Sequence, residues 1–187
     1  MNTSQVKHDI LSSRLVRRIL MSPAFPVTFQ TIAFIVVIAL AANGLGTGQA
    51  MKDDELLTLR KTNLTTLVVW GIWWPTMIAL ALGFGRVWCT ICPMELVNRI
   101  GHSLAPKIGI PRLQLGKFLR AGWLIIAGYF ILQLLVAGIS MHRVPHYTSI
   151  FIIVLLGVAL ITGLVYRDLR SFCQAFCPAG ALLSVYG

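Results

Sequence analysis

Acidic residues are scarce in this chain, and long stretches carry no charge of either sign. Only 6 of the 187 residues are Asp or Glu, against 16 Lys and Arg, and charged residues make up 12% of the total. Hydrophobic residues make up 57%, more than an ordinary soluble domain of this length contains. The composition therefore excludes an ordinary soluble domain. The basic balance has no aromatic-rich basic surface beside it, so no nucleic-acid partner is expected.

Four uncharged apolar stretches approach or reach the length of a spanning helix, which needs about 20 apolar residues. They divide the chain into a basic cytoplasmic segment, 1–26, and a membrane domain, 27–187. We predict an all-α membrane protein, surrounded by lipid, in which four helices form two repeated hairpins. The predicted spans are Val27–Leu45, Leu64–Phe84, Ala121–Ser140 and Tyr147–Val165.

Lys and Arg are distributed unequally between the two sides of these spans. Twelve lie in the two terminal segments and between the second and third spans, and four lie in the two remaining loops. The positive-inside rule then places both termini and the middle segment in the cytoplasm. The pattern is that of a multi-pass protein of a bacterial-type inner membrane. Trp88 and Trp123, near the cytoplasmic ends of spans, are expected to anchor at the membrane interface.

Cysteine occurs only four times, in two similar motifs that follow the second and fourth spans. Each motif contains an arginine, an aromatic residue, a cysteine pair and a proline, and a duplicated hairpin is the simplest account of the repeat. Proline is favoured at the first helical position, so short cytoplasmic helices are predicted at Met94–Ile100 and Ala179–Tyr186. The motifs are Arg86-Val87-Trp88-Cys89-Thr90-Ile91-Cys92-Pro93 and Arg170-Ser171-Phe172-Cys173-Gln174-Ala175-Phe176-Cys177-Pro178.

The residues of these motifs favour a soft metal. The cytoplasm is reducing, so disulfides are not expected, and close thiolate pairs suit zinc or an iron–sulfur cluster. Proline after Cys92 excludes c-type haem, and no histidine lies within a span to hold b-type haem. Helix N-termini and nearby arginines are expected to lower the thiol pKa values and to stabilise an anionic cluster. The arginines are Arg86, Arg99, Arg167 and Arg170.

Several other polar residues have modest expectations. The middle segment, with Pro106, Gly109, Pro111 and Gly116, is predicted as a loop. Glu95 is interpreted as a favourable charge at a positive helix start. Two further pairs are singled out. Gln30 and Gln133 are expected to hydrogen-bond to neighbouring helices or to contact a quinone. His142 and His146 are either polar loop residues or, on a shared helix face, a site for a metal or a haem partner.

In these motifs the chain resembles the membrane core of the NapH/NosR/MauN group of iron–sulfur proteins, which includes the oxidase assembly protein CcoG. The resemblance covers Leu64–Gly187 and is most specific over Gly85–Glu95 and Arg170–Leu183. The pair Cys173-x3-Cys177 keeps the family spacing, whereas Cys89-x2-Cys92 is one residue shorter. Family members usually continue into a ferredoxin domain that this sequence lacks. The resemblance implies membrane electron transfer, with a ferredoxin-like protein or other redox subunits as partners.

Three functions are consistent with the sequence. In the first, Cys89, Cys92, Cys173 and Cys177 ligate one [4Fe-4S] cluster, and the chain passes electrons between a membrane donor such as quinol and a redox partner. In the second, the chain is a scaffold subunit of a larger membrane redox complex, with structural or Zn-bound cysteines. In the third, it carries soft metal ions. We favour the first, an electron-transfer component rather than a stand-alone enzyme.

Overall fold

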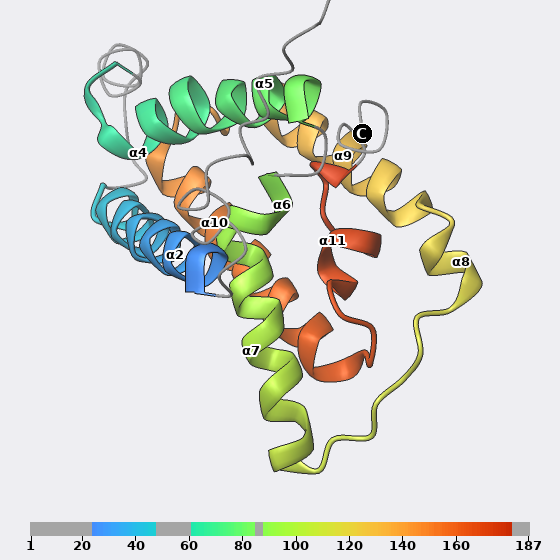
Figure 1. Ribbon diagram of the computed structural model, residues 1–187. Coiled ribbons are helices and arrows are strands. Elements are labelled where there is room, and N and C mark those ends of the chain that lie inside the picture. The colour runs from blue at the N-terminus through green and yellow to red at the C-terminus, as the bar shows by residue number, and fades with distance from the viewer. Residues whose placement is uncertain (1–23, 48–60, 85–87, 181–187) are drawn as a thin grey trace, which may run out of the picture.

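Most of the part of the chain that the structure describes is helical. The computed structural model describes residues 24–47, 61–84 and 88–180, and within these ranges the expected all-α class is confirmed. The predictions for the basic segment 1–26 and for a helix over Ala179–Tyr186 fall mostly outside them. The helices are α2 (Ala24–Leu45), α4 (Leu64–Thr66), η2 (Leu67–Trp73), α5 (Trp74–Phe84), α6 (Trp88–Ile91), α7 (Pro93–Ile108), α8 (Lys117–Arg120), α9 (Trp123–Gly138), α10 (Pro145–Val165) and α11 (Ser171–Ala175) (Figure 1).

Two of the four predicted spans are single helices long and apolar enough to cross a membrane, namely Phe25–Leu45 and Pro145–Val165. The third predicted span is the shorter helix α9, of 16 residues. It begins later than predicted because Gly122 has a φ of 84°, a left-handed conformation that separates α8 from α9. The second predicted span is helical over its whole length but is divided into α4, η2 and α5.

The middle of this second helix, η2, is a π-helix. The N–H of Trp74 bonds to the carbonyl of Val69, five residues earlier. Pro75 follows, and a proline has no N–H for the carbonyl four residues before it, which its ring also crowds. We attribute the wider turns upstream of Pro75 to this lost bond. Trp70 and Trp73, both in η2, line the cavity described below, and π-segments are frequent at functional sites.

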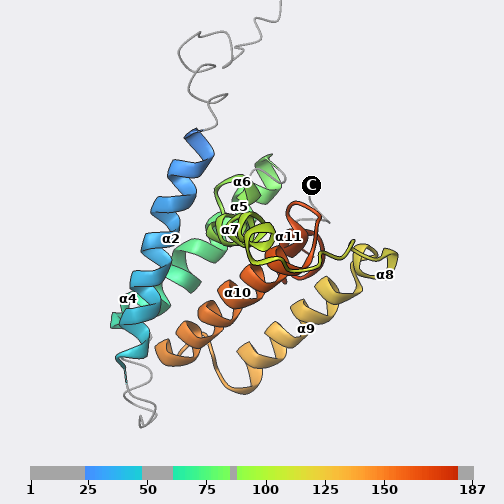
Figure 2. The same cartoon turned by 90° about the horizontal axis from the view of Figure 1, so that it is seen from below.

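Helices α7 and α10 cross at close range, and glycine makes the crossing possible. Figure 2 shows α7 nearly end-on, whereas α2, α9 and α10 run along the picture. A Cβ on Gly163 of α10 would collide with the carbonyl oxygen of Asn98, and a Cβ on Gly101 of α7 would press on that of Leu160. The close approach lets the buried Asn98 amide donate to the carbonyl of Ala159 at 3.0 Å. Small residues at such crossings are typical of membrane helices.

Helix α2 packs along α10 and is tied to α4. The hydroxyl of Thr65 donates to the carbonyl of Leu40 at 2.7 Å, and a Cβ on Gly44 would meet the carbonyl of Pro145. Apolar side chains from α2, α7, α10 and α11 form the core between them. Its buried members are Val37, Ala41, Val97, Ile152, Leu156, Ala159 and Phe172.

Helix α7 extends further than predicted. The expected short helix over Met94–Ile100 is present, but it continues through Pro106, so the prediction of a loop at that position is wrong. Ala105 is completely buried, and packing of this face outweighs the single backbone bond that a proline removes near a helix end. The helix ends at Gly109, which has a φ of 75°. The segment after Gly109 lies beside the residues that follow the C-terminal end of α10, where the N–H of Arg167 donates to the carbonyl of Leu113 at 2.9 Å.

Substitution of Gly163 by alanine tests the helix crossing. The new methyl group would collide with the Asn98 carbonyl, so Gly163→Ala is expected to destabilise the protein by about 1–3 kcal/mol, as overpacking does. Gly157→Ala in the same helix is the control, because its Cβ meets nothing within 4 Å and alanine favours the helix. The thermal midpoint in detergent is the measurement. Equal midpoints for the two variants would contradict the close crossing.

Candidate metal centre

The first cysteine motif lies at a turn between two helices. Cys89 belongs to the one-turn helix α6, and Cys92 precedes α7 with an extended backbone, φ −69° and ψ 129°. Pro93 opens α7, as predicted. The carbonyl of Cys92 accepts a hydrogen bond from the N–H of Glu95 at 3.2 Å. The second cysteine of the motif therefore occupies the N-cap position of a 16-residue helix.

The second motif has the same local plan. Arg170 turns the chain after α10 with a φ of 63°, Cys173 lies in the short helix α11, and Cys177 follows it. The carbonyl of Cys177 accepts a hydrogen bond from the N–H of Gly180 at 2.9 Å, the same three-residue spacing as in the first motif. The N–H of Cys177 donates to the carbonyl of Phe172, five residues earlier. This wider turn accommodates the extra residue of the second motif.

All four cysteines line one cavity of about 110 Å³. Apolar cavities of about 150 Å³ admit a benzene ring, so there is room for a small group. None of the cysteines forms a disulfide. Each is half-buried, and each contributes to the wall of the cavity. Much of the remaining wall is aromatic or aliphatic, including Trp70, Trp73, Trp74, Met77, Phe151 and Leu155. Two motifs far apart in the sequence thus share one apolar chamber.

The described residues form no ready-made site for a single metal ion. Across residues 24–47, 61–84 and 88–180, no three His, Cys, Asp or Glu side chains are grouped closely enough to hold one metal ion. The Cys89 and Cys173 thiols are in hydrogen-bond contact, and all four cysteines line the cavity. Zinc and a [4Fe-4S] cluster both accept four thiolate ligands, so either centre would be held by these four cysteines.

The thiols are held in their neutral form, contrary to the sequence-based expectation. Burial raises the pKa of Cys92 to about 12 and that of Cys177 to about 11, and nearby cysteines add to the rise. The N–H groups of the second and third residues after each of these cysteines act in the opposite direction. A hydrogen bond with the Cys89 thiol, together with burial, raises the pKa of Cys173. The predicted lowering of the pKa is wrong because desolvation and mutual repulsion outweigh the helix N-termini.

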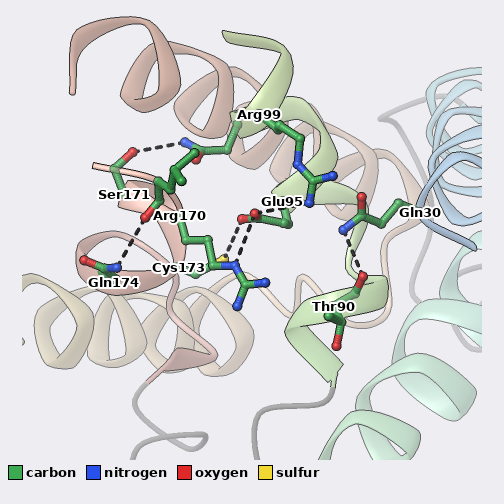
Figure 3. Close-up of polar contacts among 10 residues, drawn as sticks. Gln30, Thr90, Glu95, Arg99, Arg170, Ser171, Cys173 and Gln174 are labelled. Carbon is green, nitrogen blue, oxygen red and sulfur yellow. Dashed lines mark hydrogen bonds and ion pairs between the residues drawn. The ribbon is translucent and has the colours of Figure 1, made fainter. Parts of the chain in front are cut away.

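The buried carboxylate of Glu95 lies beside Cys173, next to two half-exposed arginines (Figure 3). The carboxylate of Glu95 contacts the guanidinium of Arg170 at 3.4 Å and that of Arg99 at 3.7 Å. The Cys173 thiol donates to the same carboxylate at 3.8 Å. Burial raises the pKa of Glu95, and the two arginines oppose that rise. Arg99 and Arg170, two of the four arginines predicted beside the centre, are thus near Cys173, and both contact Glu95. Arg86 lies outside the described residues.

The two lone glutamines of the predicted spans differ in their bonding. Gln30 is completely buried in α2, and its Nε2 donates to the carbonyl of Thr90 at 2.9 Å (Figure 3). The predicted bond to a neighbouring helix is confirmed here, and it holds the chain between Cys89 and Cys92. Gln133 instead donates to the hydroxyl of Tyr129, one turn earlier in α9, at 2.8 Å. The expectation of an interhelical bond is wrong for Gln133.

His142 and His146 do not share a helix face. His142 lies in the turn before α10, and His146 is the second residue of that helix. The His142 ring packs edge-on to Trp70 with 6.4 Å between centroids, and its Nε2 accepts a hydrogen bond from Arg143 at 3.3 Å. This geometry favours the interpretation of the pair as polar loop residues.

Comparison of the chain with protein-family models, curated proteins and solved structures finds no match. The site is therefore characterised from its own residues.

Sequence reasoning missed three positions that shape the centre. Trp88, expected at the membrane interface, packs edge-on to Trp73 at 5.4 Å and lines the cavity. Asn98 lies within hydrogen-bond distance of the hydroxyl of Ser171, at 3.1 Å, and so joins α7 to α11. Glu95 joins the two motifs rather than only capping a helix. The sequence held a signal for Glu95 and Asn98. Residues three apart in a helix share a face, so Glu95 and Asn98 lie on the same face of α7 as Cys92.

The raised thiol pKa values predict how the metal-free protein responds to alkaline pH. A thiol whose folded pKa lies above its unfolded value of 9.0 stabilises the fold fully below about pH 9, and this contribution is lost as pH rises through about 11 to 12. The thermal midpoint of the apoprotein is expected to fall over this range. The thermal midpoint of the Cys92→Ser/Cys177→Ser variant should fall less over this range than that of the unmodified apoprotein. An equal alkaline loss in both proteins would contradict thiol burial.

Proposed function

We propose that this protein is a membrane-bound iron–sulfur protein in which Cys89, Cys92, Cys173 and Cys177 hold one [4Fe-4S] cluster. The single observation that carries the proposal is the shared chamber, which all four cysteines of the chain line from two separate motifs. Four thiolates are the complete ligand set of such a cluster. A bound [4Fe-4S] cluster supplies reversible one-electron storage.

The chain's own residues support such a centre in two ways. The backbone N–H groups of the second and third residues after Cys92 and Cys177 hydrogen-bond to the sulfurs of these cysteines, and they would stabilise the thiolates that form when a metal displaces the thiol protons. The apolar wall excludes water and strengthens every charge interaction inside it. Thiols that stay neutral when buried together need a cationic centre before they ionise.

Electron transfer is favoured over catalysis by the composition of the wall. Among the described residues, the cavity lining contains no Asp, Glu, His, Lys or Arg, so its cysteines are the candidates there for general acid or base chemistry, and as cluster ligands they would not be free for it. One electron would enter from a reduced membrane donor, for which quinol is the candidate, and leave to an oxidised redox partner. A ferredoxin-like protein or another redox subunit would take that part.

The exposed apolar faces of the four long helical segments support the proposal that each segment spans the membrane. Each of the four long apolar segments presents large apolar side chains that the rest of the described chain leaves uncovered, and contiguous exposure of this kind marks a lipid or protein contact. The excess of Lys and Arg on one side puts both motifs in the cytoplasm. Examples, with their exposed fractions, are Ile35 (61%), Leu82 (60%), Phe130 (66%) and Ile161 (58%).

Metal content of anaerobically purified protein tests the cluster. We expect about four irons per chain and a broad visible absorbance that bleaches on reduction. Cys173→Ser is expected to lose iron at least as completely as Cys89→Ser, because the second motif keeps the family spacing. Ser103→Ala, on the exposed side of α7, is the control. Stoichiometric zinc would favour the scaffold alternative, and iron retained in Cys173→Ser but lost in Cys89→Ser would reverse the ranking.

The proposed topology is tested with single added cysteines at exposed positions. Arg143 lies in the turn before α10 and Lys107 near the end of α7, and both are exposed. In intact cells, a membrane-impermeant thiol reagent is expected to label Arg143→Cys and not Lys107→Cys, while the buried native thiols react slowly. Labelling at 107 from outside, with none at 143, would place the motifs on the opposite face.

A further inference from the structure

Glu95 is a carboxylate in an unusual place. It lies in the first turn of α7, three residues after Cys92, and only 3% of its surface is exposed. A carboxylate at a helix start is favourable even when it stays in water. Burial adds a large desolvation cost that only close cations or hydrogen bonds offset. The helix start alone therefore does not account for the position of this side chain.

The partners of Glu95 come from α7 and from the second cysteine motif. Arg99, one turn later in α7, contacts its carboxylate at 3.7 Å. Arg170, the residue that opens the second motif, contacts it at 3.4 Å, and the Cys173 thiol donates to it at 3.8 Å. Figure 3 shows the carboxylate between these groups, with α7 on one side and α11 on the other. A side chain two residues after the first motif thus contacts a cysteine of the second.

Arg170 itself is held in a strained conformation. Its φ of 63° lies in the left-handed region, which is unfavourable for a residue other than glycine. Such residues persist where surrounding contacts fix them. Arg170 is the N-cap of α11, so its ion pair with Glu95 fixes the start of the helix that carries Cys173.

Fixed charges lie beside the place where a metal centre would bind. Cys173 would hold that centre as a thiolate, so its sulfur and the Glu95 carboxylate would be two anions side by side. The Arg170 and Arg99 guanidiniums next to the carboxylate would offset that repulsion. The charge of the buried Glu95 is weakly screened and those of the half-exposed arginines more strongly, and the reduction potential of an iron–sulfur centre depends on nearby charge and hydrogen bonds.

We propose that Glu95 and Arg170 are positioning residues that couple the two cysteine motifs and set the reduction potential of the centre with opposite signs. The electrochemical part of the proposal rests on the proposed function, and its structural part rests on the contacts of Glu95 with Arg170 and Cys173. Reduction adds an electron to the centre, so the negative Glu95 opposes reduction and the positive Arg170 favours it. Removing the first charge raises the potential, and removing the second lowers it.

The electrochemical test compares Glu95→Gln, Arg170→Gln and their double variant by redox titration of the cluster signal. We expect a higher potential in Glu95→Gln, a lower one in Arg170→Gln, and an intermediate value in the double variant. Arg143→Gln is the control, because it removes the same charge at the opposite end of α10 and should leave the potential unchanged. Shifts of the same sign, or no shift in either single variant, would overturn the proposal.

A test on the metal-free protein separates this proposal from the proposed function. Alkylation of Cys173, measured relative to Cys89 by peptide mass spectrometry, is expected to be about fivefold faster in both single variants, as for the loss of one hydrogen bond. Unchanged alkylation would overturn the structural part. If the wild-type protein contains no iron, the proposed function is overturned. The alkylation measurement still tests whether Glu95 and Arg170 hold Cys173 in place.

Two further variants keep the proposal falsifiable if the glutamine substitutions fail to load iron. Arg170→Lys keeps the charge and should leave the potential near that of the wild type. Arg99→Gln removes the more distant partner of the same carboxylate, at 3.7 Å against 3.4 Å for Arg170, and it should lower the potential less than Arg170→Gln would. A large shift in Arg170→Lys, or a rise in Arg99→Gln, would overturn the electrostatic assignment.

Discussion

Burial of four thiols around one apolar chamber is the constraint on which the rest of this structure depends. Thiolates cannot be gathered in such a place unless a cation joins them, so burial raises the pKa values of Cys92 and Cys177 to about 12 and 11. The backbone N–H groups that follow Cys92 and Cys177 favour the ionised form without adding charge to the chamber. The chain thus prepares sulfurs that release protons when a metal centre binds.

The polar residues that hold this chamber all act from outside its wall. Gln30 bonds to the chain between Cys89 and Cys92, and Asn98 reaches α11 from α7. Glu95 and Arg170 join the motifs by charge. These bonds depend on the close crossing of α7 and α10 at Gly101 and Gly163. Apolar lining with polar support behind it keeps the ligands in place while water stays out.

The sequence predicted the elements far better than their interactions. Uncharged apolar stretches and the Cys-Pro pairs were sufficient to locate the four long helical segments and the start of α7, because these depend on local composition, whereas the short helices α6, α8 and α11 were not predicted. The π-helix before Pro75 and the passage of α7 through Pro106 depend on packing, which outweighs local preference. The thiol pKa values were predicted in the wrong direction, since the count of nearby cations ignores desolvation. Glu95 and Asn98 acquire their importance only from residues more than sixty positions away.

The central claim is that both cysteine motifs ligate one cluster within a single chain. Anomalous diffraction at the iron edge, from crystals of anaerobically purified protein, locates the irons directly. The account predicts one compact group of iron positions, bonded at about 2.3 Å, the metal–sulfur distance seen for thiolates, to the sulfurs of all four cysteines. Two separate iron positions, one at each motif, or a centre shared with a second chain, would contradict it.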